Sequence, residues 1–469
     1  MSLWQPWLER DPKQVALSHA GQTLTWQVLD SQVAHYAKAL REQGVRSGEV
    51  VTLVGKNHLH TVLWFLACTQ VGALCTFVAP QPLALLQEKL ATLYAEQSPK
   101  HLWLAPSCAL SEEEIAELNA HRLSLPDERD ESVGGEKVSS QFSCEQLATL
   151  IFTSGSTGTP KAVTHTHQQH LASARGLLNK FAFTESDSWL LSLPLYHISG
   201  VAILYRWLAV GATLKIGTGD LQNDIAGVTH ASLVPTQLKR LLDSSSPLTL
   251  KRVLLGGSHI PVELAQMAAT RGIDTWLGYG MTEAASTVTA KRVDGLAGNG
   301  ELLDHRELRL VDGRIFIAGK TLAQGYYWQG QLVPLTNEQG WFDSKDLGRW
   351  QGNNLLIDGR ADNLFISGGE NVHCEEIEAV LNQHPHVQVA IVIPVQDSEF
   401  GARPVAVIRS EAEWCQAIGD TWCQAKLEKF KWPIMYFLLP DALLDGGIKV
   451  SRAAVKAWLA ANQTQFTPL

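Results

Sequence analysis

The chain has 469 residues and a mass of 51.4 kDa, which is long for one domain and predicts roughly two to four. It is 45% hydrophobic and 18% charged with a mean hydropathy of −0.03, so it can form large cores, and its composition excludes a disordered chain. Lys and Arg number 38 against 47 Asp and Glu, and the net charge of −9 argues against a nucleic-acid partner but not against small phosphorylated ligands.

The cysteines and the first residues bear on where the protein works. The 7 cysteines form no CxxC pair, and an odd number is a poor disulfide framework, so we expect reduced thiols. No basic segment followed by an apolar run opens the chain, so no signal peptide is expected. The apolar stretch Leu59–Ala79 contains His60, Gln70 and Gly72, which favours a buried helix and then a strand over a membrane span. We expect a cytoplasmic protein without membrane insertion, and the composition leaves a homo-oligomer open.

The first part of the chain alternates between helical and extended patterns. Residues 25–43 have the apolar spacing of an amphipathic helix, which Thr25 can cap and Gly44 can end. A buried strand is predicted over Val50–Val54. Further short apolar runs, each followed by a helical segment or a polar loop, are predicted as strands at 148–152, 189–193, 231–234, 253–255 and 275–277. This alternation predicts parallel sheets covered by helices on both faces.

Three segments along the rest of the chain differ in sequence pattern from the first part. Ser107–Gln146 is polar and acidic and is predicted to be a surface excursion. After Gly295, short runs with many glycines are typical of antiparallel hairpins. From Asp362, a helix over 375–381 and a strand over 387–395 predict a separate compact unit.

The strongest local motif is ATLIFTSGSTGTPKAV, Ala148–Val163, in which a strand leads into a Gly/Ser/Thr loop ending at Lys161. Glycines let backbone amides approach phosphate oxygens, and Lys161 adds a positive charge. A Walker A loop is excluded because Pro160 precedes Lys161 and Ala162 follows it. A flexible linker is the alternative for such a composition, and the preceding strand weakens it.

This loop resembles the phosphate-binding signature of the adenylate-forming superfamily, which includes acyl- and aryl-CoA ligases, peptide-synthetase adenylation domains and luciferases. Four more elements resemble those of the superfamily and follow in its order. They are LGYGMTEAAS (277–286), WFDSKDLGRW (341–350), IDGRADNLFISGGENVHCEEIE (357–378) and GGIKVSR (446–452). The resemblance covers most of the chain.

The resemblance implies an α/β fold with two domains. Residues 1–361 would form a large ATP- and acid-binding domain of parallel and mixed sheets covered by helices, with a β-rich subdomain. Residues 362–469 would form a small, mobile α+β domain that rotates about Asp362 between two half-reactions. Ser367, Gly368 and Gly369 would then line the tunnel for the thiol. The implied activity is that of an ATP-dependent acid–CoA ligase, with ATP, Mg²⁺ and coenzyme A as cofactor and co-substrates.

The resemblance also implies roles for single residues. Glu283 would bind Mg²⁺, which favours carboxylate and phosphate oxygens, although Glu283 could instead cap a helix. Tyr279 would stack on adenine, Asp346 rather than Asp343 would accept the ribose hydroxyls, and Arg360 would reach ribose or phosphate. The complete ATP-binding set is Thr153, Ser154, Gly155, Ser156, Thr157, Gly158, Lys161, Gly257, Ser258, Tyr279, Gly280, Thr282, Asp346 and Arg360.

The implied catalytic residues are Lys449, Glu283 and His197. Lys449 would bridge carboxylate and α-phosphate oxygens during adenylation. The superfamily has Gly directly before this lysine, whereas Ile448 stands there in this chain.

The stretch PLYHISGVAILYRW bears on which carboxylic acid is the substrate. It contains no acidic residue to hold an α-ammonium group, which argues against an α-amino acid. His197 and Arg206 instead favour an acid with a second anionic group. PLYHISG, THASLVPTQLKRLL and GGIKVSR resemble the o-succinylbenzoate–CoA ligases of menaquinone biosynthesis, whose substrate has two carboxylates. Arg206 would be the counter-ion of the second carboxylate, with Ser199 and Thr287 as hydroxyl donors. The alternative for Arg206 is a surface arginine.

Two other functions stay open at this point. One is an aryl- or acyl-CoA ligase for a different acid, and the other is a silent nucleotide-binding regulator of the same fold. The presence of Lys449, Glu283 and Asp346 together argues against the regulator. His165, His167 and His170 have a spacing that could bind zinc, but without a nearby cysteine a solvated helix start is favoured.

Overall fold

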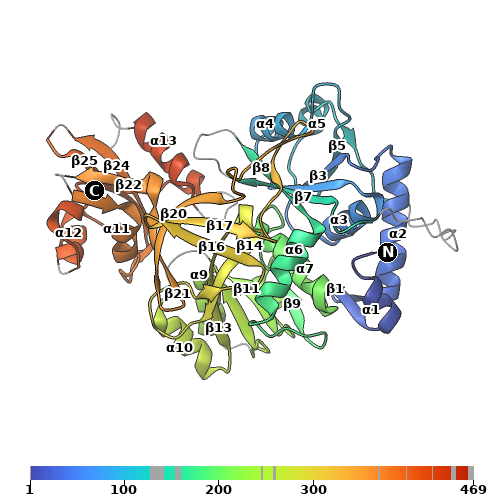
Figure 1. Ribbon diagram of the computed structural model, residues 1–469, viewed down its shortest axis with the longest axis horizontal. Coiled ribbons are helices and arrows are strands. Elements are labelled where there is room, and N and C mark those ends of the chain that lie inside the picture. Colours follow the sequence, from blue (N-terminus) through green and yellow to red (C-terminus); the bar gives the residue numbers. More distant parts are fainter. Residues whose placement is uncertain are drawn as a thin grey trace.

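The computed structural model (Figure 1) describes residues 2–126, 142–153, 160–244, 247–256, 260–367, 370–397, 399–424, 426–444 and 450–462. Within these residues the chain forms four sheets, of which two are large and belong to the N-terminal part.

The first large sheet has eight strands, in the order β19-β18-β8-β7-β4-β3-β5-β6. The inner strands β7, β4, β3 and β5 run parallel, whereas β8, β18 and β19 extend the sheet by antiparallel pairing. The strands are β3 (Val50–Val54), β4 (Leu74–Val78), β5 (His101–Leu104), β6 (His121–Arg122), β7 (Leu147–Thr153), β8 (Lys161–Thr166), β18 (Gly325–Trp328) and β19 (Gln331–Val333).

The second large sheet has nine strands, in the order β15-β14-β13-β12-β11-β9-β10-β1-β2. Its centre from β13 to β1 is parallel, and antiparallel strands close both ends. The strands are β1 (Val15–His19), β2 (Gln22–Thr25), β9 (Ser188–Leu190), β10 (Thr213–Ile216), β11 (His230–Leu233), β12 (Arg252–Leu255), β13 (Asp274–Met281), β14 (Ser286–Arg292) and β15 (Glu301–Leu302).

Helices lie between these sheets and on their outer faces (Figure 1). The largest core joins both sheets to α2 (Trp26–Glu42), α3 (Leu59–Val71), α6 (His167–Leu178) and α7 (Ile198–Val210). A second core lies under α9 (Pro235–Asp243) and α10 (Val262–Thr270) on the nine-stranded sheet, and a third lies under α4 (Leu83–Leu93) on the eight-stranded sheet. The short helices are α1 (Gln5–Arg10), α5 (Glu112–Glu117) and α8 (Leu221–Asp224).

The later part of the chain forms two smaller units. Antiparallel strands β16 (Arg306–Val311), β17 (Arg314–Gly319), β20 (Phe342–Gln351) and β21 (Asn354–Arg360) make a four-stranded sheet. The last unit, orange to red in Figure 1, contains β22 (Leu364–Ser367), β23 (Glu370–His373), β24 (Val387–Asp397), β25 (Gly401–Ser410) and β26 (Tyr436–Leu438). Its helices are α11 (Cys374–Leu381), α12 (Gln416–Gln424) and α13 (Arg452–Asn462), and its two core clusters contain only residues from Phe365 onward.

Most local predictions are confirmed. Helix α2 begins after Thr25, whose hydroxyl accepts the amide of Val28, and β3 matches the predicted strand. The α/β class and the antiparallel hairpins are likewise confirmed. The strand predicted at 189–193 is wrong at its end, because β9 stops at Leu190 and the next residues leave the sheet. Among the described residues, no helix is long and apolar enough to cross a membrane.

Candidate active site

The predicted phosphate loop is flanked by two paired strands, β7 and β8. Thr153, the last residue of β7, lies opposite Lys161, the first residue of β8. The Lys161 ammonium lies 5.3 Å from the ring centre of Tyr326 on the adjacent strand β18. The loop residues Ser154, Gly155, Ser156, Thr157 and Gly158 lie outside the described residues. The structure therefore places a cation where the predicted loop rejoins the sheet.

Glu283 lies next to this strand pair, in the short 3-10 helix Thr282–Ala284 that follows β13. Its Oε1 accepts a hydrogen bond of 3.2 Å from the hydroxyl of Tyr326. Burial raises the pKa of Glu283, and hydrogen bonds from its own amide and from Tyr326 oppose this effect. Just before it, Gly280 leaves room for β14, because a Cβ there would lie 1.9 Å from the carbonyl oxygen of Ser286. Tyr326 was not predicted, since its pairing with β8 joins distant parts of the sequence.

The carboxylate of Glu283 fits the way proteins hold Mg²⁺. Within the described part of the chain, no three His, Cys, Asp or Glu side chains form a group that could hold a metal ion. Mg²⁺ does not need such a group, because it is usually bound by one or two carboxylates together with substrate phosphates and water.

Asp346 and Asp343 have different surroundings. Asp346 is 7% exposed, and its two oxygens accept hydrogen bonds from the Tyr279 hydroxyl at 2.6 Å and from Arg360 at 3.1 Å. Asp343 instead forms a bidentate pair with Arg314, with both distances 2.7 Å. Among these two acids, only Asp346 is joined to other predicted nucleotide-binding residues.

Arg360 links this cluster to the predicted hinge. Besides Asp346, it donates to both carboxylate oxygens of Asp362, at 2.8 and 3.0 Å. Burial alone would raise the pKa of Asp362, but the hydrogen bonds and charge of Arg360 lower it. One guanidinium therefore pairs with both the predicted ribose ligand and the predicted hinge residue.

The remaining predicted site residues are described only in part. Ser367 is buried at the end of β22, and its hydroxyl lies 3.5 Å from the carbonyl oxygen of Phe430. Gly257, Ser258, Gly368, Gly369 and Lys449 lie outside the described residues.

Arg206 is a buried cation on α7. It is 2% exposed, its guanidinium lies 5.2 Å from the ring centre of Trp189, and its Nη2 donates to the Thr287 hydroxyl at 3.4 Å. Its Nε has no hydrogen-bond partner, and no carboxylate of the described residues lies within ion-pair distance. Burial and the charge of Arg306 lower the pKa of Arg206 to about 9. The surface alternative for Arg206 is therefore wrong, and the arginine can bind an anion.

His197 occupies the N-cap position of the same helix, one residue before α7, and Ser199 lies half-buried in its first turn. The Nε2 atom of His197 is buried without a hydrogen-bond partner. Burial, and then the charge of Lys89, lower the pKa of His197. Lys89, which the sequence did not predict, donates to Gln81 at 2.7 Å, and burial lowers its pKa to about 8. A lone lysine among the leucines of its helix was the only available signal.

The three histidines of β8 and α6 are not solvated, and that prediction is wrong. His165, His167 and His170 are 0%, 3% and 1% exposed. His167 bonds the Tyr205 hydroxyl at 2.8 Å, and His170 bonds Thr149 at 2.7 Å. Burial lowers the pKa of His165 and His167 to about 3. They are neutral core residues, because His165 lies on β8 against α6, and His167 and His170 lie on the face of α6 that contacts Tyr205 of α7.

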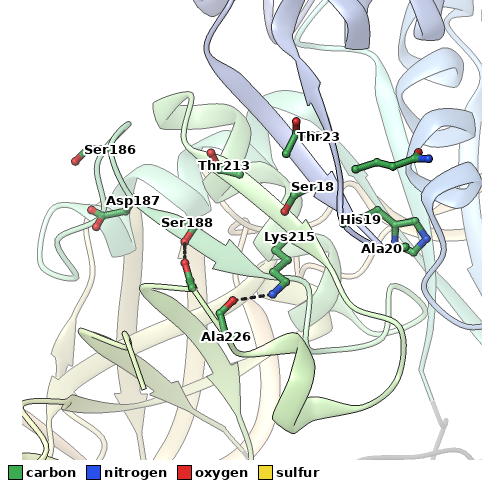
Figure 2. Close-up of a pocket in the computed structure, with 13 residues that line it drawn as sticks. Ser18, His19, Ala20, Thr23, Ser186, Asp187, Ser188, Thr213, Lys215 and Ala226 are labelled. Carbon is green, nitrogen blue, oxygen red and sulfur yellow. Dashed lines mark hydrogen bonds between the residues drawn. The ribbon is translucent and has the colours of Figure 1, made fainter. Parts of the chain in front are cut away.

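Figure 2 shows a surface pocket of about 410 Å³ elsewhere, lined by residues of β1, β9 and β10 such as Ser18, Ser188 and Thr213. None of the predicted site residues lines it. Its lysine, Lys215, already donates to the carbonyl oxygen of Ala226 at 2.7 Å. The pocket therefore has no part in the site described above.

Comparison with known proteins agrees with this geometry. The family model of the AMP-binding enzymes matches residues 4–327. The 2-succinylbenzoate–CoA ligase of Salmonella typhimurium is 42% identical over 464 residues, covering 98% of both chains, and that of Escherichia coli is 41% identical over 462 residues.

Solved structures give the same result. A variant of E. coli MenE with bound OSB-AMS superposes with a TM-score of 0.86 at 40% identity, covering 97% of this chain and 98% of the other. Bacillus subtilis MenE, in complex with ATP and magnesium ion, has a TM-score of 0.81 at 26% identity, covering 93% and 95%. The chain belongs to the AMP-binding enzyme family and, within it, to the 2-succinylbenzoate–CoA ligases.

Proposed function

We propose that this member of the AMP-binding enzyme family converts 2-succinylbenzoate, ATP and CoA into 2-succinylbenzoyl-CoA, AMP and diphosphate, as a ligase of menaquinone biosynthesis in the cytoplasm. The first half-reaction forms a bond between a carboxylate oxygen and the α-phosphorus and releases diphosphate. In the second, the CoA thiolate attacks the acyl carbon and AMP leaves.

The observation that carries the choice of acid is the buried guanidinium of Arg206. 2-Succinylbenzoate has two carboxylates, and the one that is not activated must stay ionised away from water, where an unpaired charge is costly. Arg206 supplies the opposite charge, and the Thr287 hydroxyl beside it supplies a donor or acceptor. Ser199 lies on the same helix about two turns earlier and is the second hydroxyl of this set. An acid without the second carboxylate would leave Arg206 unpaired.

We assign the nucleotide to the residues joined around Asp346. Asp346 would accept the ribose hydroxyls, Tyr279 would lie against adenine, and Gly257 and Ser258 would border it. Thr153, Lys161 and the loop between them would hold the phosphates, with the amides of the loop and the charge of Lys161 stabilising the negative charge that develops there.

Mg²⁺ would be held by Glu283, with Thr282 and Gly280 shaping the turn before it. When bound, Mg²⁺ supplies Lewis-acid stabilisation of phosphate charge. The Tyr326 hydroxyl already fixes one oxygen of the Glu283 carboxylate, so the other oxygen can point to the ion.

We assign Lys449 to the first half-reaction, where its ammonium would neutralise the carboxylate and α-phosphate oxygens as they approach. His197 would lie at the acyl group, because it directly precedes the helix that carries Arg206. Burial and Lys89 keep its ring neutral, so it can donate or accept one hydrogen bond.

We also propose that residues 362–469 move as one domain about Asp362, bringing Ser367, Gly368 and Gly369 to the thiol in the second half-reaction. Two features support this boundary. The core clusters of the last unit contain no described residue before Phe365, and a 3-10 helix, Ala361–Asn363, separates β21 from β22.

A panel of acids tests the function. The purified protein is incubated with ATP, Mg²⁺, CoA and one acid at a time, and AMP, diphosphate and acyl-CoA are measured. 2-Succinylbenzoate should give all three products in equal amounts, whereas benzoate, longer fatty acids and α-amino acids should give little. Turnover of another acid, with none of 2-succinylbenzoate, would refute the proposal.

A further inference from the structure

Asn57 connects the two large sheets beside the acid-binding helix. It lies in the turn between β3 of the eight-stranded sheet and α3. Its Nδ2 donates to the carbonyl oxygens of Leu191 at 3.1 Å and Leu193 at 2.9 Å, and its Oδ1 accepts from the amide of Leu195 at 2.9 Å. Both ends of this one amide are therefore used by the segment Leu191–Leu195.

This segment is where β9 of the nine-stranded sheet ends and the chain turns toward α7. The Leu191 amide still donates to the carbonyl oxygen of Lys215 on β10, but the following residues leave the sheet. Buried backbone groups without partners are costly, and the Asn57 amide supplies partners for three backbone groups of the segment. The end of β9 at Leu190 agrees with this arrangement, because the carbonyl oxygens of Leu191 and Leu193 and the amide of Leu195 bond to the Asn57 side chain and not to a strand.

The segment in turn fixes the start of α7. The carbonyl oxygen of Pro194 accepts the amide of His197 at 3.1 Å. A Cβ on Gly200 would lie only 2.1 Å from the same oxygen, so the first turn of α7 is in direct contact with the segment. His197 has no side-chain capping bond of its own, and its position depends on this backbone.

The turn that carries Asn57 is itself constrained. Gly55 has φ +144°, and a Cβ there would lie 2.3 Å from the Cβ of Ala105. The amide of Lys56 donates to the Ser107 hydroxyl at 2.8 Å. Asn57 thus projects from a backbone that is fixed to the eight-stranded sheet, which also carries Thr153 and Lys161.

We propose that Asn57 is a positioning residue for the acid, which holds the segment Leu191–Leu195 and the start of α7 in register with the sheet that bears the phosphate loop. This inference rests on the proposed function, since it assigns the acid to the side of α7 that carries His197, Ser199 and Arg206. Asn57 touches none of the predicted nucleotide-binding residues through a described hydrogen bond.

The test compares Asn57→Ala and the isosteric Asn57→Asp with Gln43→Ala. Gln43 is a matched control, because its amide also makes three hydrogen bonds, to the carbonyl oxygens of Ala39 and Ser124 and from the amide of Ser124. Asn57→Asp keeps the acceptor for Leu195 but loses both donors, and its similar shape guards against failure to fold. KM for 2-succinylbenzoate, KM for ATP and the thermal midpoint are measured for each variant.

Loss of Asn57 should raise KM for 2-succinylbenzoate by about tenfold or more and leave KM for ATP within about twofold. Gln43→Ala should lower the thermal midpoint without changing either KM beyond about twofold. Equal increases in both KM values, an unchanged acid KM in a folded Asn57 variant, or the same split in Gln43→Ala would overturn the proposal. If the wild type prefers another acid in the panel, the proposed function is wrong, and the Asn57 variants are then measured with that acid. The two proposals can therefore fail separately.

Discussion

Replacing Arg206 should separate acid affinity from stability. Arg206→Met keeps most of the side-chain volume and removes the charge. A hydrogen bond to a charged group contributes about 1.5–3 kcal/mol, so KM for 2-succinylbenzoate should rise roughly 10- to 150-fold. Stability should not fall in parallel. Burial, and then the charge of Arg306, lower the pKa of Arg206 to about 9, so the ionised side chain is destabilised in the folded chain. Removing this charge should therefore hold or raise the free energy of unfolding of the ligand-free protein.

The assay measures KM for 2-succinylbenzoate, benzoate and ATP, together with urea unfolding. Arg306→Met is the matched control, because Arg306 is also buried but donates to Ser173 Oγ at 2.8 Å and to two carbonyl oxygens. Arg306→Met should lose stability and keep the ratio of the two acid KM values. An unchanged KM for 2-succinylbenzoate in Arg206→Met, or an equal increase for benzoate, would refute the counter-ion role.

Three further predictions concern catalysis and stability. Lys449→Ala should abolish acyl-adenylate formation and spare thioester formation from preformed adenylate, and rapid-quench assays of each half-reaction would reveal an equal loss if the role is wrong. Asp362→Pro fixes φ near −65° and should slow one half-reaction far more than the other, whereas two unchanged rates would contradict the hinge. His165, His167 and His170 are neutral when folded, because burial lowers the pKa of each, whereas unfolded histidines bind protons below about pH 6.5. Stability should be full above this pH and fall by up to about 4 kcal/mol per pH unit toward pH 3. Urea titrations between pH 7 and 4 measure this slope, and a flat profile would contradict it.

The features that the sequence predicted well are those set by neighbouring residues. Helix α2 follows from its apolar spacing and from the cap at Thr25, and β3 follows from five consecutive apolar or β-branched residues. The ordered motifs likewise indicated Asp346, Tyr279 and Arg360, and the structure brings these three side chains into one hydrogen-bonded group. The spacing of the motifs could not show that Arg360 also binds Asp362, because that contact depends on the path of the chain between β21 and β22.

The errors have a common physical cause, which is that burial is decided by elements distant in sequence. His165, His167 and His170 look hydrophilic in a local window, yet all three are buried. His165 lies on β8 inside the eight-stranded sheet, and His167 and His170 lie on α6 against Tyr205 of α7. The same holds for Tyr326, whose hydroxyl reaches Glu283 only because β18 pairs with β8.

Arg206 and Arg306 show why burial of a charge is informative about function. Both arginines are buried, but they differ in their partners. Arg306 donates three hydrogen bonds to protein acceptors. Arg206 donates one hydrogen bond, to the Thr287 hydroxyl, and otherwise contacts the indole ring of Trp189. A protein selected for stability alone would gain by replacing a poorly paired buried charge with an apolar side chain. A poorly paired buried arginine is explained if a ligand supplies the anion that pairs with it. The attraction between the guanidinium and that anion is strong because water is excluded from the site. The incomplete pairing of Arg206 by protein groups therefore supports a dianionic acid more directly than any of the predicted ATP-binding motifs.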